Sequence, residues 1–302
     1  MTLPGPLGTP IRLTAALLAA AATLAAALLG AGVAQTGTGE LEIPAAGTIT
    51  LLRLFILLAL AVQLGELVGV RLAGEGPLPR RWSLPAAALG LASSAALLGL
   101  LAVISGLRLG TVYGLREGRL LLVTANAFAL AALCAASRRP ALALAPLAVA
   151  VGAEALRAHP EAYTPAIGFG LTVVHLTGAS LWCGTLLYVL RTMRLREGGA
   201  DVLRRYARMA AWVFAALAVT GTCSTLRRLP LDAVLTTAYG RVLLFKLALF
   251  GVAALLALTA RRRMLRGADA QPPARAELAV LGGVVLVSAL LTVVPDPHWL
   301  VH

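Results

Sequence analysis

Long runs of hydrophobic residues alternate with short polar connections along the whole chain. A transmembrane helix needs about 20 apolar residues, because each residue advances about 1.5 Å through a hydrocarbon layer about 30 Å thick. Nine runs approach this length: 11–33, 46–70, 84–105, 120–136, 141–156, 167–190, 210–226, 242–260 and 278–294. The fourth, fifth and seventh runs are short, so the pattern predicts eight to nine membrane-spanning helices.

The continuity of these runs favours helices over a β-barrel. Within lipid, backbone polar groups must be satisfied inside the protein, which only helices and closed barrels achieve. Barrel strands would alternate apolar and polar residues in segments of about ten residues. The runs here are instead continuous and rich in Ala, Leu and the small residue Gly, which lets helices approach closely. We therefore expect an all-α fold, a polytopic transmembrane helical bundle in the lipid bilayer.

The composition supports a membrane protein and argues against several enzyme classes. Hydrophobic residues make up 59% of the chain and charged residues 13%, whereas average soluble domains contain roughly 25% charged residues. The sequence contains no phosphate-binding loop, no dinucleotide-binding G-x-G-x-x-G and no G-x-S-x-G nucleophile pattern. We therefore expect no enzyme. Any transport would be passive, or driven by an ion gradient or a partner.

The first run also has features of a secretory signal peptide. Arg12 precedes it, and small residues surround Ala34. Its length of about 23 residues nevertheless exceeds the usual hydrophobic core of a signal peptide, which is 7 to 15 residues. We expect the run to be retained as the first helix.

The arginines are distributed unequally between alternate connections, and this predicts the orientation. With a cytoplasmic N-terminus, the cytoplasmic arginines are 12, 71, 80, 81, 138, 139, 191, 194, 196, 204, 205, 208, 261, 262, 263, 266 and 275. The opposite side then has arginines 108, 116, 119, 157, 227, 228 and 241. Cytoplasmic loops are enriched in Lys and Arg, so we expect nine helices, with the N-terminus inside and the C-terminus outside. The same bias accounts for the formal charge of +13, and we do not expect nucleic-acid binding.

A few polar residues lie inside the predicted spans. A charge at the centre of such a helix costs about 2.5–3.5 kcal/mol on insertion scales, so these side chains should face the bundle interior or reach an interface. Lys246, the one lysine of the sequence, is expected to extend outward or to pair with Glu154. The set comprises Arg53, Glu66, Asn126, Glu154, His175 and Lys246.

His175 is the leading candidate site residue. It lies roughly 12 Å along the helix from Ile167, and an ionisable group inside a span is a functional hypothesis by default. Gly178, Ala179 and Trp182 share its helical stripe. The small residues leave space for either a partner helix or a ligand. His175 is therefore interpreted as a packing residue bonded to a neighbouring helix, or as a ligand of a metal or haem.

Further candidate ligands lie near the predicted outer face. Cys134, Cys183 and Cys223 form no C-x-x-C pair and are interpreted as small packing residues, although Cys223 lies beside threonines near the outer end of its helix. Imidazole and carboxylate groups are competent ligands for copper, zinc or nickel. Exposed side chains at loop ends are otherwise simply solvated. The outer set comprises His159, Glu161, Asp296, His298 and His302.

The second half of the chain contains several motifs in a fixed order: His175 with Trp182 and Gly184 in HLTGASLWCGTLLYVL, Thr220–Gly221, and Tyr239–Gly240–Arg241 with Lys246. Through these motifs, residues 164–296 resemble the copper resistance protein D family. The first half is looser: LLRLFILLALAVQLGELVGV looks like an early family helix, and Ala158 replaces a glycine before His159. We therefore divide the chain at residue 158 into about five N-terminal spans, 1–158, and about four family-like spans, 159–302.

The resemblance implies a function in copper handling. It implies a multi-pass protein of the bacterial plasma membrane that moves copper across the membrane in copper resistance or uptake, together with an extracytoplasmic copper-binding protein. His175, His159, Cys223 and His298 are then the expected copper ligands. Methionine is scarce, with 4 in the chain, so a ladder of thioether ligands for the soft Cu(I) ion is not expected.

Two other functions remain open from the sequence. A haem-binding membrane oxidoreductase would use His175 as an axial ligand, because histidines in helical bundles commonly hold haem. Ligation by two histidines would require a second histidine inside a span, and the predicted spans contain none. The other alternative is a copper-delivery or assembly factor that does not itself transport copper.

Overall fold

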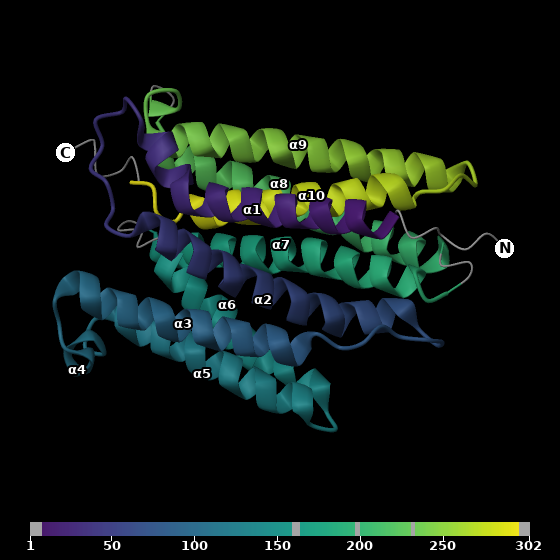
Figure 1. Cartoon of the computed structure of the whole chain (residues 1–302), viewed down its shortest axis with the longest axis horizontal. Coiled ribbons are helices and arrows are strands. Elements are labelled where there is room, and N and C mark those ends of the chain that lie inside the picture. The colour runs from purple at the N-terminus through teal and green to yellow at the C-terminus, as the bar shows by residue number, and fades with distance from the viewer. Residues whose placement is uncertain (1–7, 159–163, 197–199, 231–232, 296–302) are drawn as a thin grey trace.

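The computed structural model describes residues 8–158, 164–196, 200–230 and 233–295, and this part of the chain is helical without strands (Figure 1). Nine of its helices are long and apolar enough to cross a membrane. The predicted helical membrane bundle is therefore confirmed for the described residues. The elements are α1 (Gly8–Gln35), α2 (Ala46–Ala73), α3 (Ser83–Ser105), α4 (Leu109–Val112), α5 (Arg116–Ala136), η1 (Pro140–Ala143), α6 (Leu144–Ala158), α7 (Pro165–Met193), α8 (Ala200–Arg228), α9 (Ala238–Leu265) and α10 (Gln271–Leu290).

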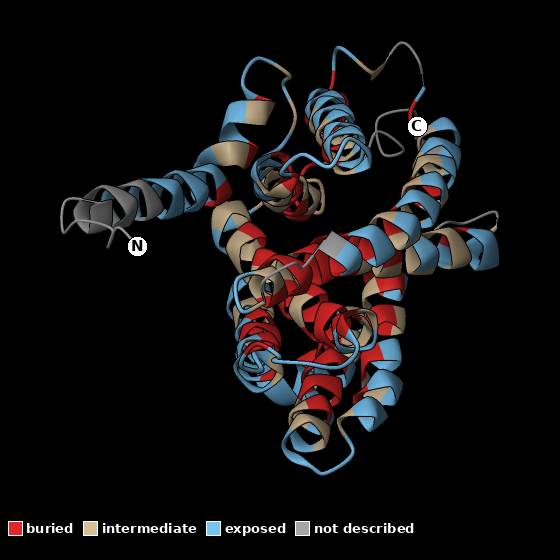
Figure 2. Cartoon of the chain, turned by 90° about the vertical axis from the view of Figure 1, so that its right-hand side faces the viewer, coloured by how far each residue is buried: buried red, intermediate tan, exposed pale blue. Residues whose placement is uncertain are grey.

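The long helices run side by side along one axis, so their connections lie at two opposite ends of the bundle (Figure 1). The left end in Figure 1, where α8 stops and α9 begins, is called the α8–α9 end below. The right end, where α9 stops and α10 begins, is called the α9–α10 end. The buried residues concentrate in the middle of the bundle, whereas α1 lies at its edge with largely exposed side chains (Figure 2).

The central helix pair is α2 and α7, and glycine allows these helices to touch through their backbones. A Cβ atom added to Gly184 would lie 1.7 Å from the carbonyl oxygen of Ala61, and one added to Gly65 would lie 2.1 Å from the carbonyl carbon of Gly184. Small residues permit this close approach of membrane helices. The contact fixes α7, which carries His175, and it crosses the predicted boundary between the two halves. That boundary stays a prediction.

The predicted partner of Lys246 was wrong, because Glu154 belongs to a different charge cluster near the α8–α9 end. Arg157 donates from Nη1 to Glu154 at 2.7 Å and from Nη2 to Glu117 at 2.8 Å. Arg53 approaches Glu117 at 3.6 Å. These opposite charges pair with one another between α2, α5 and α6. The helices of the short fourth and fifth apolar runs therefore include paired charged residues and are long enough to cross a membrane.

Two further polar residues of the spans, Glu66 and Asn126, differ in whether they face the bundle interior. Glu66 is buried and accepts hydrogen bonds from the backbone N–H of Trp82 at 2.7 Å and from Arg191 at 3.2 Å, where α3 begins. Asn126, by contrast, is exposed, so the expectation of an inward or interfacial position is wrong for it. Its amide donates to the carbonyl oxygen of Leu122 at 2.8 Å, and this bond to its own helix lowers the cost of facing outward.

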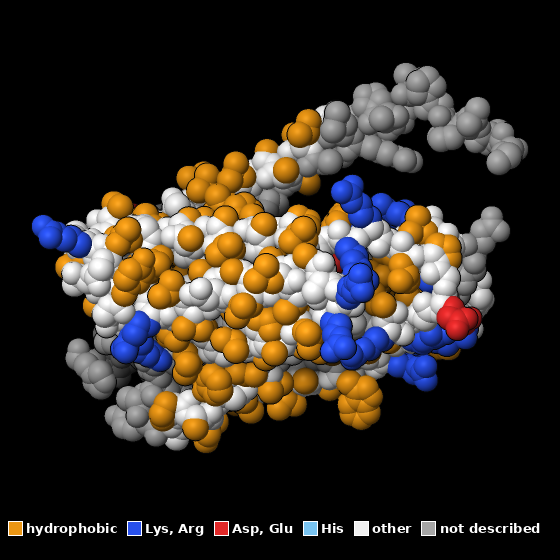
Figure 3. Space-filling model, turned by 90° about the horizontal axis from the view of Figure 1, so that it is seen from below, with side chains coloured by type: hydrophobic (Ala, Val, Ile, Leu, Met, Phe, Trp, Pro, Cys, Tyr) orange, Lys and Arg blue, Asp and Glu red, His pale blue; other side chains and the backbone are white. Residues whose placement is uncertain are grey.

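The connections that contain the two predicted arginine sets lie at opposite ends of the bundle. The larger set lies at the α9–α10 end, and the face shown in Figure 3 has a hydrophobic belt between basic side chains at both ends. This arrangement matches helices that traverse a bilayer with most arginines on one side. The assignment of the α9–α10 end to the cytoplasm stays a prediction from the arginine bias.

Candidate functional site

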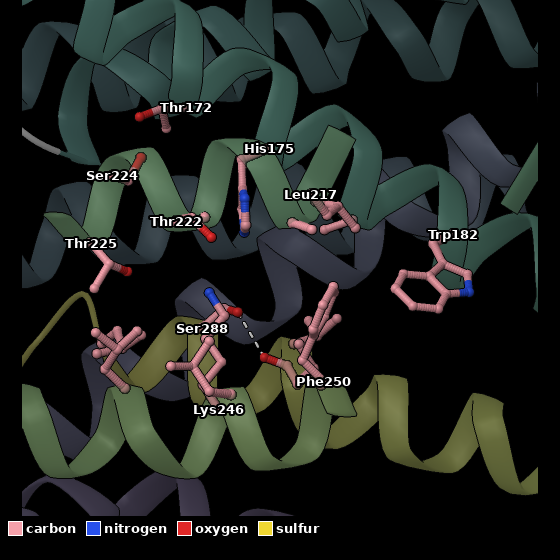
Figure 4. Close-up of a pocket in the computed structure, with 18 of the residues that line it drawn as sticks. Thr172, His175, Trp182, Leu217, Thr222, Ser224, Thr225, Lys246, Phe250 and Ser288 are labelled. Atoms are coloured by element: carbon pink, nitrogen blue, oxygen red, sulfur yellow. Dashed lines mark hydrogen bonds between the residues drawn. The ribbon is translucent and has the colours of Figure 1, made fainter. Parts of the chain in front are cut away.

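His175 faces a cavity of about 280 Å³ between α7, α8, α9 and α10 (Figure 4). The cavity lies toward the α8–α9 end, about 15 Å along α7 from Pro165. Its lining combines aliphatic and polar side chains. The polar lining includes Thr172, His175, Cys183, Thr222, Ser224, Thr225, Tyr239, Lys246, Ser288 and Thr292.

The packing of the four helices creates this space. Helix α8 packs mainly on α7, and α9 packs mainly on α10, whereas α8 and α9 touch much less. Small residues keep the space between the two pairs open, since Ala179 and Gly221 line it. A Cβ on Gly221 would lie 3.6 Å from Cε1 of His175. The glycine therefore leaves room beside the imidazole ring.

The orientation of His175 is set by Thr220 of α8. The Nδ1 atom of His175 lies 3.1 Å from Oγ1 of Thr220. The hydroxyl group of Thr220 donates its own proton to the carbonyl oxygen of Ala216 at 2.8 Å. Since a hydroxyl group has one proton, Nδ1 of His175 is the donor in the contact between the side chains. The neutral ring then has its lone pair on Nε2, which has no hydrogen-bond partner among the described residues and remains available to a ligand.

Lys246 enters the same cavity from α9, opposite α7 (Figure 4). Within the described part of the chain it forms neither an ion pair nor a hydrogen bond. Its position eight residues after Ala238 places it about 12 Å along α9, at a depth similar to that of His175. An ammonium group and a neutral imidazole thus face the same space. The positive charge opposes the binding of a metal cation there.

Three aromatic rings pack together beside the His175 cavity. The rings of Phe214 and Phe250 stack with centroids 5.0 Å apart. The Trp182 ring stands edge-on to both, with centroid distances of 5.9 Å to Phe214 and 5.7 Å to Phe250. Trp182 and Phe250 line the His175 cavity. We refer to Trp182, Phe214 and Phe250 as the aromatic cluster.

A second cavity of about 170 Å³ lies on the other side of this cluster, toward the α9–α10 end. Its lining includes Glu277 on α10, which is 1% exposed. The carboxylate accepts hydrogen bonds at Oε1 from Trp182 Nε1 at 2.7 Å and from the Tyr206 hydroxyl at 3.0 Å. We refer to this space as the Glu277 cavity.

Sequence reasoning did not identify Glu277 as a residue of a span. The last apolar run was predicted to begin at residue 278, immediately after it, whereas α10 begins at Gln271 with prolines in its first turn. Proline favours the first turn of a helix. Glu277 is also one helical turn from Ala274 and Leu281, which are buried. This spacing indicates a shared inward face and could have identified the residue.

Residues 200–294 match the family model of copper resistance protein D. The range contains α8, α9 and α10, and with them Thr220, Lys246 and Glu277. The predicted resemblance is confirmed over this range, whereas His175, Trp182 and Gly184 precede it. No curated protein and no solved structure matches the chain. The described residues contain nine helices able to cross a membrane, and the segment 200–294 among them is similar to copper resistance protein D.

Some of the predicted ligands on α7 and on residues 200–294 lie at the same cavity, and others do not. His175 shares its cavity with Cys183, a buried thiol about 12 Å further along α7. Cys223 is exposed on α8 and is not among the residues that line the cavity. His159 and His298 lie outside the described residues. The sequence analysis interpreted Cys183 only as a packing residue. Its spacing from His175 along the helix does not by itself show that both residues line one cavity.

The donor set does not fit a tightly held resident copper ion. The described residues contain no group of three His, Cys, Asp or Glu side chains placed to hold one metal. Besides His175, the cavity is lined by hydroxyl groups, by the distant thiol of Cys183 and by the ammonium group of Lys246. One imidazole with weak oxygen donors does not make a complete ligand set for permanent coordination of copper.

Proposed function

We propose that the protein transports copper ions across the bacterial plasma membrane, with the His175 cavity as the binding site for the ion in transit. The observation that carries the proposal is the position of His175. Its free Nε2 atom faces a cavity whose other three helices lie in the segment that matches the copper resistance protein D family. Copper is thus the transported substrate rather than a resident cofactor.

The weak ligand set of the cavity supports transport rather than storage. A conducted ion must bind favourably enough to enter and weakly enough to leave. A single imidazole provides affinity for copper, while Lys246 limits it by charge repulsion. Both residues lie nearer the α8–α9 end, which the arginine bias assigns to the outside. An extracytoplasmic copper-binding protein would deliver copper there, and His159, Cys223 and His298 remain predicted ligands at that face.

Copper uptake into liposomes tests the proposal. The purified protein is reconstituted into liposomes that enclose a copper-sensitive dye, and copper is added outside. We expect uptake by the wild type, and a rate at least about tenfold lower for His175→Ala, which is equivalent to a loss of about 1.4 kcal/mol. Val174→Ala is the matched control because Val174 precedes His175 on α7 and is 46% exposed.

The outcome separates the candidate functions. Uptake no faster than in protein-free liposomes would overturn transport. Copper bound by His175 without uptake would instead indicate a delivery or assembly factor. The haem alternative predicts an intense Soret band that is lost in His175→Ala. The described residues that line the cavity include neither a methionine nor a second histidine, so His175 would be the one axial ligand within that set.

A further inference from the structure

The His175 cavity and the Glu277 cavity lie in sequence along the bundle, and Trp182 lines both. Phe250 borders the first and Phe214 the second. The two phenyl rings are nearly parallel, at 8°, and the indole is nearly perpendicular to both. Such close-packed rings form a hydrophobic constriction of the kind that closes ion pathways.

The Glu277 carboxylate is only half satisfied by its neighbours. Both hydrogen bonds, from Trp182 and Tyr206, go to Oε1. Oε2 has no hydrogen-bond partner among the described residues, although the side chain is 1% exposed and lines the cavity. Most polar atoms of buried side chains have a hydrogen-bond partner. The unpaired oxygen therefore points to a ligand that completes the site.

The charge of this region favours a cation as that ligand. Arg261 lines the Glu277 cavity, but no ion pair links it to Glu277 within the described part of the chain. A carboxylate inside a membrane span without a paired basic side chain is costly, and such residues commonly mark ion pathways.

We propose that the Glu277 cavity is a second cation-binding site with Glu277 as its anionic ligand, and that the aromatic cluster is the closed barrier between it and His175. Trp182 connects the two features, because its ring belongs to the barrier while its Nε1–H binds the carboxylate. A cation at Oε2 of Glu277 lies beside the carboxylate that the indole binds through Oε1, and so changes the environment of Trp182. That the cation is copper rests on the proposed transport function. The cation site itself does not.

Trp182 fluorescence tests the site without any assumption about transport. The full-length protein carries Trp82→Phe, Trp212→Phe and Trp299→Phe, which leaves Trp182 as the sole tryptophan, and His175→Ala, which removes the first site. Copper, Na⁺ and Mg²⁺ are titrated separately. We expect a saturable change in Trp182 emission with copper that is lost in Glu277→Gln. Gln retains an oxygen that accepts the two hydrogen bonds but has no charge. Glu277→Asp, which retains the charge, should still respond if Glu277→Gln fails to fold.

The fluorescence titrations can overturn the proposed cation site. No change with any of the three cations, or an equal change in Glu277→Gln, would overturn it. A response to Na⁺ or Mg²⁺ alone would support the cation site and remove copper as its ligand.

Copper uptake tests whether the site belongs to the transport path. In liposomes, Glu277→Gln should transport copper at least about tenfold more slowly, a loss equivalent to 1.4 kcal/mol, while copper binding by His175 is unchanged. Wild-type rates in Glu277→Gln would overturn this role of Glu277. Absence of uptake by the wild type would overturn the proposed transport function instead, and the fluorescence result would then decide the cation site by itself.

Discussion

His175 donates from Nδ1 to the hydroxyl oxygen of Thr220, 3.1 Å away, and this contact joins α7 to α8. The bond fixes both the rotation and the tautomer of the imidazole. Through it, a residue that precedes the family match is positioned by a residue within the match. The second neighbours of a metal ligand commonly tune its affinity in this way.

The first prediction concerns this hydrogen bond. Thr220→Val preserves the shape of the side chain but removes the acceptor, so Nδ1 loses its partner and Nε2 is no longer fixed as the free nitrogen. We expect copper affinity to fall about 10- to 100-fold, the typical effect of losing such a supporting bond. Competition with a chromogenic copper chelator measures the affinity. Thr220→Ser, which retains the hydroxyl group, should bind nearly as the wild type, and equal affinity in Thr220→Val would contradict the assignment.

The second prediction concerns the crossing of α2 and α7. Gly184→Ala would place a Cβ atom 1.7 Å from the carbonyl oxygen of Ala61. The helices must then separate, and overpacking of this kind costs about 1–3 kcal/mol or more. We expect a clear loss of monodisperse protein after detergent extraction and a lower unfolding temperature.

Gly170→Ala on the same helix is the matched control for Gly184→Ala. A Cβ atom at Gly170 meets no atom within 4 Å, so this variant should have the yield and unfolding temperature of the wild type. Equal behaviour of the two variants would show that the close contact does not limit folding.

The number of spans and the helical class could be predicted from the sequence because run length and continuity determine them. Pairings between helices could not, because they depend on how each helix is rotated. Glu154 therefore paired with Arg157 rather than Lys246, and Cys223 faced outward although Thr220, three residues earlier, binds His175. Glu277 was missed for another reason: α10 extends beyond the apolar run, through a polar turn that the fold buries.

The third prediction tests the aromatic cluster as a barrier. Phe250→Ala removes one of the stacked rings between the two cavities and should allow small ions to pass. Liposomes with a pH-sensitive dye and a potassium gradient should show a proton leak several-fold above that of the wild type. Phe245→Ala is the control, because Phe245 is on the same helix but 58% exposed. An equal leak in both variants would contradict a barrier at Phe250.

The fourth prediction concerns the charge opposite His175. Lys246 has no ion-pair partner among the described residues, so Lys246→Gln should not reduce the yield of folded protein. Removal of a positive charge from a partly enclosed cavity should strengthen copper binding. The expected gain is about tenfold, equivalent to roughly 1.4 kcal/mol. Chelator competition measures it on the purified protein.

Faster transport does not necessarily follow from tighter binding in Lys246→Gln. If Lys246 weakens the site so that copper can leave, the variant should hold copper longer and transport it more slowly at saturating copper. Lys246→Arg retains the charge and should preserve the affinity of the wild type. Tighter binding with slower uptake in Lys246→Gln alone would identify Lys246 as the residue that promotes release. Unchanged affinity in this variant would show that its charge does not act on the ion bound by His175.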